Sequence, residues 1–146
     1  IVNTRGAIFT HKDGIVLRPQ YFVFQLYANL MKDTVLNIWQ QDVPTVTGTR
    51  DGQEHTVDLV DVVVTQGEGG YAIGAINKDA AQHQTIDLAI LDDTLTEMRI
   101  HTVNGPATNS YNDIDRTEVG ITVSEWMPFT GSVTLEPHSV NVIEMR

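Results

Sequence analysis

The sequence is rich in side chains that could act as acids, bases or nucleophiles, with 19 Asp and Glu residues among 146. Glycoside cleavage, for example, uses two carboxyl groups that face one sugar, roughly 5–10 Å apart. Glu97, Glu118 and Glu125 are candidates for such a pair, but nothing in their spacing singles out two of them. Carboxylates are mostly solvated surface groups, so the sequence predicts no catalytic pair.

Metal, thiol and cofactor chemistry have little support in the spacing of the remaining polar residues. The sequence has no cysteine, which removes thiolate ligands, disulfides and thiol nucleophiles. There is no Gly-x-Ser-x-Gly elbow, and the glycine-rich run 67–70 lacks the Lys-Ser/Thr of a phosphate loop. A metal site needs convergent ligands, whereas the five histidines show no i, i+4 or His-x-His spacing; they stand at positions 11, 55, 83, 101 and 138. We therefore expect no metal and no cofactor.

Aromatic rings offer a different chemistry, because an exposed ring gives a sugar a large apolar face to stack on at little entropic cost. Outside the N-terminal region, the tryptophan and tyrosine rings are those of Trp39, Tyr71, Tyr111 and Trp126. The two tryptophans lie in strand-like patterns, so we expect them to anchor a core or a domain interface. Tyr111 lies in the polar run NSYNDIDR and is the candidate for sugar contact.

Most of the chain must supply strands to position these residues. From residue 35 onward, short alternating or β-branched runs are broken by turn signals, which is typical of an antiparallel β-sandwich of seven or eight strands in Greek-key or jelly-roll order. The last two strands are expected to pair across the turn formed by residues 136–138. The expected strands are 35–41, 55–65, 71–77, 84–91, 97–103, 119–127, 131–135 and 139–145.

The first 31 residues have another character. They predict a short strand, a turn around Asp13-Gly14, a second apolar run and a helix that Pro19 opens, since proline suits the first helical position. On a helical wheel the apolar residues cover about two thirds of the circumference, more than the stripe of somewhat over 100° that a surface helix needs. We expect Phe22, Leu26 and Leu30 to be partly bare, or to be covered by a second copy or a larger neighbour.

Composition narrows the class of protein. A hydrophobic content of 41% and a charged content of 19% are typical of a folded domain. A net charge of −10 argues against nucleic acid and anionic membranes as partners. No apolar run approaches the roughly 20 residues that span a bilayer. We expect a soluble protein, located either in the bacterial cytoplasm or outside the cell.

The chain begins at Ile1 inside a patterned segment, so we expect it to be a piece of something longer.

The opening segment VNTRGAIFTHKDGIVLRPQYFVFQLYANLM resembles the end of the catalytic barrel in α-L-arabinofuranosidases of glycoside hydrolase family fifty-one. A second, weaker similarity lies in the run Asn109-Ser110-Tyr111-Asn112 after the turn Asn104-Gly105. The segment 133–140 is similar to the last hairpin of that family's sandwich. The residues that carry the first match are Val2, Asn3, Thr10, Gly14, Val16, Leu17, Pro19, Tyr21, Val23, Phe24, Leu26 and Tyr27.

The resemblance implies that residues 1–33 are the remnant of the last βα unit of a (β/α)₈ barrel and that residues 34–146 form a C-terminal sandwich. It implies a retaining enzyme that removes terminal α-L-arabinofuranosyl groups from arabinan or arabinoxylan, with both catalytic glutamates upstream of this chain. The fragment alone should then be inactive, with the barrel as its partner. Barrel loops after the strands approach substrate, so Arg5 is a second candidate for sugar contact; the family's substrate-contacting Gln has no counterpart at Gly6.

The residues leave two alternative functions open. One is a carbohydrate-binding module that uses Tyr111. The other is a structural interaction domain that forms a homo-oligomer through the helix.

Overall fold

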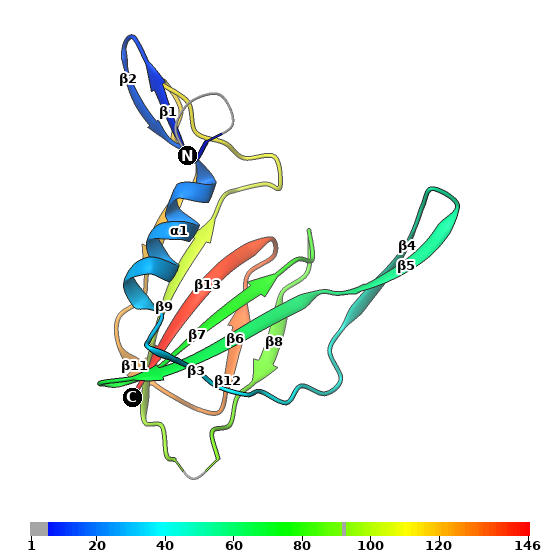
Figure 1. Cartoon of the computed structure of the whole chain (residues 1–146), viewed down its shortest axis with the longest axis vertical. Coiled ribbons are helices and arrows are strands. Elements are labelled where there is room, and N and C mark those ends of the chain that lie inside the picture. The colour runs from blue at the N-terminus through cyan, green and yellow to red at the C-terminus, as the bar shows by residue number, and fades with distance from the viewer. Residues whose placement is uncertain (1–5, 92) are drawn as a thin grey trace.

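The computed structural model describes residues 6–91 and 93–146, and these form a mainly antiparallel β protein with one helix (Figure 1). The main sheet has the order β10-β9-β13-β7-β6-β3, and β11 also pairs with β9. Its strands are β10 (Gly120–Val123), β9 (Glu97–Asn104), β13 (Ser139–Met145), β7 (Gly70–Asn77), β6 (Val60–Gly67), β3 (Thr34–Val35) and β11 (Met127–Pro128).

A second, smaller layer faces the main sheet. It consists of β8 (Gln84–Asp87) paired with β12 (Ser132–Leu135). Between the two layers lies the larger core cluster, which includes Ile73, Leu135 and Ile143, each at most 2% exposed. As expected, Ile86, Leu88 and Ile90 all turn toward this core. The predicted antiparallel sandwich, preceded by a strand–loop segment and one helix, is confirmed.

Helix α1 (Pro19–Leu30) covers the other face of the main sheet, where it packs on β13, β9 and β10. Leu26 is 3% exposed and contributes to a second core cluster with Val103 and Val142. Phe22 and Leu30 pack against the same cluster. The expectation that Leu26 would be bare or buried by another molecule is therefore wrong, because the chain's own sheet covers it. Phe24, by contrast, is 67% exposed.

Two hairpins stand apart from these layers in Figure 1. The first joins β1 (Ile8–His11) to β2 (Gly14–Leu17) just before α1, as the sequence predicted. The second joins β4 (Thr45–Arg50) to β5 (Gln53–Asp58) through Asp51-Gly52, and we call it the arm. Both turn residues have positive φ, 53° and 76°, as a two-residue hairpin of the primed type requires.

The arm and the segment before it show that two of the predicted strands are wrong. The stretch 35–41 is not a strand beyond Val35, and 55–65 is not one doubly buried strand. Instead, β5 ends at Asp58 and β6 begins at Val60, where the Leu59 N–H donates to the Pro44 carbonyl at 2.7 Å. Every residue of β5 is exposed, whereas β6 runs through the core. The apolar centre at 59–64 predicted the buried strand, but it carried no sign of where the arm joins it.

The C-terminal hairpin predicted between 131–135 and 139–145 is also wrong. β12 pairs with β8 in the small layer, and β13 pairs with β7 and β9 in the main sheet. Residues 136–138 carry the chain from the small layer to the main sheet. Pro137 has no N–H to extend a strand ladder, and His138 has a positive φ of 43°. The His138 N–H donates to the Asp79 carbonyl at 2.8 Å, which ties the crossing to the loop after β7.

The predicted strand 119–127 is interrupted as well. β10 ends at Val123, and β11 resumes pairing with β9 at Met127. At the break, the Ser124 hydroxyl accepts from the Ile100 N–H at 2.9 Å. A side chain thus replaces the backbone partner that a continuous strand would have supplied. No described helix is long and apolar enough to cross a membrane.

Candidate functional site

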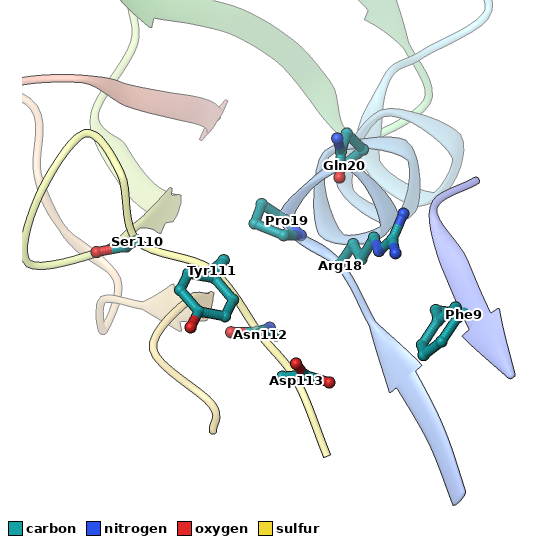
Figure 2. A pocket seen from close by; sticks show the side chains of 8 residues that line it. All are labelled: Phe9, Arg18, Pro19, Gln20, Ser110, Tyr111, Asn112 and Asp113. Carbon is teal, nitrogen blue, oxygen red and sulfur yellow. The ribbon is translucent and has the colours of Figure 1, made fainter. Parts of the chain in front are cut away.

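A hollow of about 410 Å³ lies where three segments distant in the sequence meet (Figure 2). β1 contributes Phe9, and the junction between β2 and α1 contributes residues 18–20. The loop between β9 and β10 contributes residues 110–113, which include Tyr111. Its lining thus combines an aromatic ring from the loop with charged and amide groups from both sides.

Arg18 shapes the wall on the side of the first hairpin. Its backbone N–H donates to the Ala7 carbonyl at 2.9 Å, and one guanidinium nitrogen donates to the Gly6 carbonyl at 3.4 Å. The guanidinium carbon lies 5.2 Å from the centre of the Phe9 ring, within the range of a cation–π contact. Pro19 begins the helix immediately after Arg18. The contacts of Arg18 thus fix the first hairpin against the start of α1 on this side of the hollow.

Asn112 holds the loop against that wall. Its side-chain NH₂ donates to the Leu17 carbonyl at 2.9 Å and to the Val119 carbonyl at 2.8 Å. Its Oδ1 accepts from the N–H groups of Glu118 and Val119, both at 2.9 Å. The residue is 8% exposed. One buried amide therefore closes the loop on itself and fastens it to the end of β2.

Gly105 tightens the base of the same loop. A Cβ there would lie 2.6 Å from the Ser110 Cβ and 2.9 Å from a Val119 methyl group. Only a glycine allows this close approach. The turn Asn104-Gly105 noted in the sequence is thus part of what positions Ser110 and Tyr111.

Tyr111 is 48% exposed at the edge of the hollow. The Arg116 guanidinium carbon lies 4.1 Å from its ring centre, so one face of the ring carries a stacked cation. Arg116 also donates to Glu118 at 2.5 Å. The hydrogen bond from Arg116 is the main cause that lowers the pKa of Glu118, and the same bond raises the pKa of Arg116. Both groups are therefore charged at neutral pH, and Tyr111 can offer a ligand only its other ring face.

The carboxyl groups at and beside the hollow are engaged by other groups of the chain. Glu118 is engaged by Arg116, and the Asp113 Oδ1 accepts from the Ile114 N–H at 2.8 Å. Elsewhere, Glu97 forms an ion pair with Arg146 at 2.8 Å. The part of the chain that the structure describes contains no group of three or more His, Cys, Asp or Glu placed to hold a metal ion.

The other residues that the sequence singled out have different surroundings. Arg5 lies outside the described residues, so its role as a sugar contact stays a prediction. Tyr71 is buried, and its hydroxyl donates to Asp93 at 2.7 Å; this hydrogen bond raises the pKa of Tyr71. Trp126 is half-buried between the guanidinium groups of Arg99 and Arg146, at 4.9 and 4.1 Å. Trp39 is 81% exposed, so it does not anchor the core of this domain, and its role at a domain interface stays a prediction.

Two residues that build the site escaped the sequence reasoning. Asn112 lay inside a quoted motif, but nothing in the motif indicated a buried side chain with four partners. Arg18 stands directly before the predicted helix start, and the sequence offered no sign that it would meet Phe9. Both depend on contacts between distant segments, which no local pattern reveals.

The family model described as the α-L-arabinofuranosidase C-terminal domain matches residues 1–139 of this chain. The chain belongs to this family. A relative named probable α-L-arabinofuranosidase C, from Aspergillus clavatus, is 26% identical over 153 residues and aligns with 99% of this chain and 29% of its own length. The resemblance inferred from the sequence is confirmed.

Solved structures agree in fold. The family 51 arabinofuranosidase of Xanthomonas axonopodis pv. citri has a TM-score of 0.84 at 24% identity, covering 100% of this chain and 30% of that one. The α-L-arabinofuranosidase of Thermotoga maritima, solved as an arabinose complex, has a TM-score of 0.80 at 23% identity, covering 98% and 32%. The chain thus spans less than a third of the length of the relatives it matches.

Proposed function

We propose that this chain is the non-catalytic C-terminal domain of a retaining α-L-arabinofuranosidase, which removes terminal α-L-arabinofuranosyl groups from arabinan or arabinoxylan. The match of the C-terminal domain family over residues 1–139 carries the proposal. The remaining two thirds of such an enzyme, with its two catalytic glutamates, would precede this chain.

Within this proposal, residues 1–33 complete the last βα unit of a (β/α)₈ barrel, and residues 34–146 form the sandwich. The contacts of α1 support a shared helix. Leu26 is buried against the main sheet, while Phe24, two residues earlier, is 67% exposed. We propose that the barrel, as covalent partner, covers the Phe24 side of α1. The sandwich then braces the barrel through this helix. A homo-oligomer through the same side is the competing arrangement.

The activity is tested with an aryl α-L-arabinofuranoside. The 146-residue chain should give no turnover, and the longer natural protein should release the aryl group with retention. Glu125→Gln, which changes an exposed carboxyl of the sandwich, should leave the activity of the longer protein unchanged. Turnover by the short chain that disappears when one of its carboxylates is changed would contradict the proposal, as would an inactive longer protein.

A second candidate function is carbohydrate binding at the hollow. The observation in its favour is that Tyr111 keeps 48% of its surface exposed beside the polar groups of Arg18 and Asp113. A ring face next to hydrogen-bonding groups is the usual composition of a small-molecule site. The sugar bound would be an arabinose-containing chain passing near the barrel.

Affinity electrophoresis in arabinan and arabinoxylan gels tests this second function. Tyr111→Ala should weaken retardation about 2- to 10-fold, the range expected for the loss of one stacked ring. Trp39→Ala is the matched control, because it removes an even more exposed ring outside the hollow. Equal losses in both variants, or no binding by the original chain, would reject Tyr111 as a sugar contact.

A further inference from the structure

The hairpin formed by β1 and β2 is not part of a larger sheet. Among the described residues, these two strands pair only with each other. A two-stranded hairpin alone is marginally stable in water, so its orientation must depend on contacts with other segments. Each strand has four residues, and at about 3.3 Å per residue the hairpin reaches roughly 10 Å beyond its base.

The loop between β9 and β10 contacts both ends of this hairpin (Figure 1). At the base, the Asn112 side-chain NH₂ donates to the Leu17 carbonyl at 2.9 Å. At the turn, the position that a Cβ of Gly14 would take lies 3.7 Å from Cδ1 of Ile114. Gly14 and Leu17 are the first and last residues of β2. The loop therefore fixes the direction of that strand as well as its position.

Ile114 is presented to the hairpin by a tight turn. The Asp113 N–H donates to the Arg116 carbonyl at 2.7 Å, and the Arg116 N–H donates back to the Asp113 carbonyl at 3.1 Å. These reciprocal bonds close residues 113–116 into a turn. The Ile114 N–H in addition donates to the Asp113 Oδ1 at 2.8 Å. The backbone of Ile114 is thus held by the loop, so its side chain can transmit the position of the loop to the hairpin.

The residue type at position 114 does not serve the turn itself. Turn positions are mostly occupied by Gly, Pro, Asn, Asp and Ser, and an isoleucine stands here in the polar run NSYNDIDR. Ile114 is half-buried, whereas its neighbours Asp113 and Asp115 are exposed. The side chain is also not among those that line the hollow. Its contact with the hairpin at Gly14 accounts for both the residue type and its burial.

The consequence of this contact rests on the enzymatic role proposed above. In that enzyme α1 is the last barrel helix, so the β1–β2 hairpin is the loop between the last barrel strand and this helix. Loops that follow barrel strands surround the substrate. We propose that Ile114 is a positioning residue, through which the sandwich holds the β1–β2 hairpin at the rim of the barrel's substrate site.

The length of the hairpin indicates which part of the substrate it meets. The chemistry of a barrel enzyme takes place near the ends of the strands, and the hairpin reaches roughly 10 Å further out. Its turn therefore contacts the sugars beyond the terminal arabinofuranosyl group. An aryl arabinofuranoside has no such sugars, whereas a linear arabino-oligosaccharide has. Loosening the hairpin removes binding that is equal in the ground state and the transition state, which raises KM and leaves kcat unchanged.

Steady-state kinetics of the longer natural protein on both substrates test the proposal. Ile114→Ser should raise KM for the arabino-oligosaccharide about 5-fold or more, with kcat on both substrates and KM for the aryl arabinofuranoside within about 2-fold of the original. Ile114→Val deletes only the Cδ1 methyl that faces Gly14, so it should change the same KM in the same direction by less. This milder variant keeps the test decisive if the serine variant folds poorly.

Asp115→Asn is the matched control, because it changes an exposed side chain of the same turn and keeps Ile114. It should leave KM for both substrates unchanged. Hydrogen exchange of the longer protein supplies a readout that does not depend on activity. The amides of β1 and β2 should exchange faster in Ile114→Ser and at the original rate in Asp115→Asn.

Three results overturn the proposal while leaving the enzymatic role intact. They are an unchanged KM for the oligosaccharide in Ile114→Ser, an equal rise of KM for both substrates, and hairpin amides that exchange at the original rate in that variant. A longer protein that does not cleave the aryl arabinofuranoside would instead reject the proposed function, and the role of Ile114 with it.

Discussion

Asn112 is the residue on which the geometry of the hollow depends most directly. Its four hydrogen bonds satisfy buried backbone groups in the loop and at Leu17. Asn112→Ala should lower the free energy of unfolding by about 2–4 kcal/mol, because buried donors and acceptors lose their partners. Urea unfolding measures the change. Asn109→Ala, at an exposed position of the same loop, should alter it by less than about 0.5 kcal/mol; equal effects would mean that the loop is not held by Asn112.

Glu144 sits in a charged cluster on the helix side of the main sheet, 2.7 Å from His101 Nε2 and 3.0 Å from Arg99 Nε. Burial acts to raise the pKa of Glu144, but the hydrogen bonds from Arg99 and His101 outweigh it, so the pKa lies below the ordinary 4.5. A carboxyl with a lowered folded-state pKa adds stability that is complete above its unfolded value and is lost as the pH falls through the folded value.

Glu144→Gln should therefore destabilise the chain most at neutral pH, and its difference from the original chain should shrink below about pH 4.5. Chemical unfolding across this pH range measures both curves. Glu125→Gln reports the effect of removing an exposed carboxyl elsewhere. A difference that stays constant from pH 7 to below pH 3 would show that Glu144 stabilises by packing alone.

At the scale of single residues, the sequence predicted the exposure of Tyr111 but not the contacts around it. It singled out Tyr111 as the accessible ring, and the ring is accessible. It could not predict that Arg116, five residues later, would stack on one face, nor that Trp39 would be bare. Stacking and exposure depend on where loops pass, and loops follow contacts that the local pattern does not encode.

At the level of elements, Gly74 in β7 sets how closely α1 approaches the sheet. A Cβ at this position would lie 2.6 Å from the Tyr27 hydroxyl and 2.9 Å from a Val63 methyl group. Gly74→Ala should cost about 1–3 kcal/mol, as overpacking does. Thermal unfolding followed by circular dichroism measures it. Gly120→Ala in β10 is the control, since nothing lies within 4 Å of its Cβ position. A neutral Gly74→Ala would show that the helix can shift without cost.

Helices and strands were predictable where the hydrophobic period of the sequence was strong, but the pairing partners of the strands were not. The helix begins at Pro19 as proline predicts, and the alternation at 84–90 places its apolar residues on the core. The pairing of β12 with β13 was predicted from their closeness in the sequence. It is wrong because residues 136–138 cross between layers, and a three-residue link can serve a hairpin or a crossing equally well.

At the scale of the whole molecule, the layers are independent of the arm. The Pro44 carbonyl and the Leu59 N–H are already 2.7 Å apart at its base. Replacing residues 45–58 by two glycines should therefore leave the midpoint of thermal unfolding within about 3 °C of the original, because the removed residues bury almost nothing. A fall of more than about 10 °C would mean that the arm helps to hold the sandwich together.

The central position of β13 has a consequence for the order in which the main sheet can form. β7 and β9 do not pair with each other; each pairs with β13, which follows both in the sequence. During synthesis, the inner edges of β7 and β9 emerge from the ribosome with open hydrogen-bonding groups and must wait for β13. Until then both are exposed to misassociation, so folding of this sheet is completed late and by insertion between strands already made.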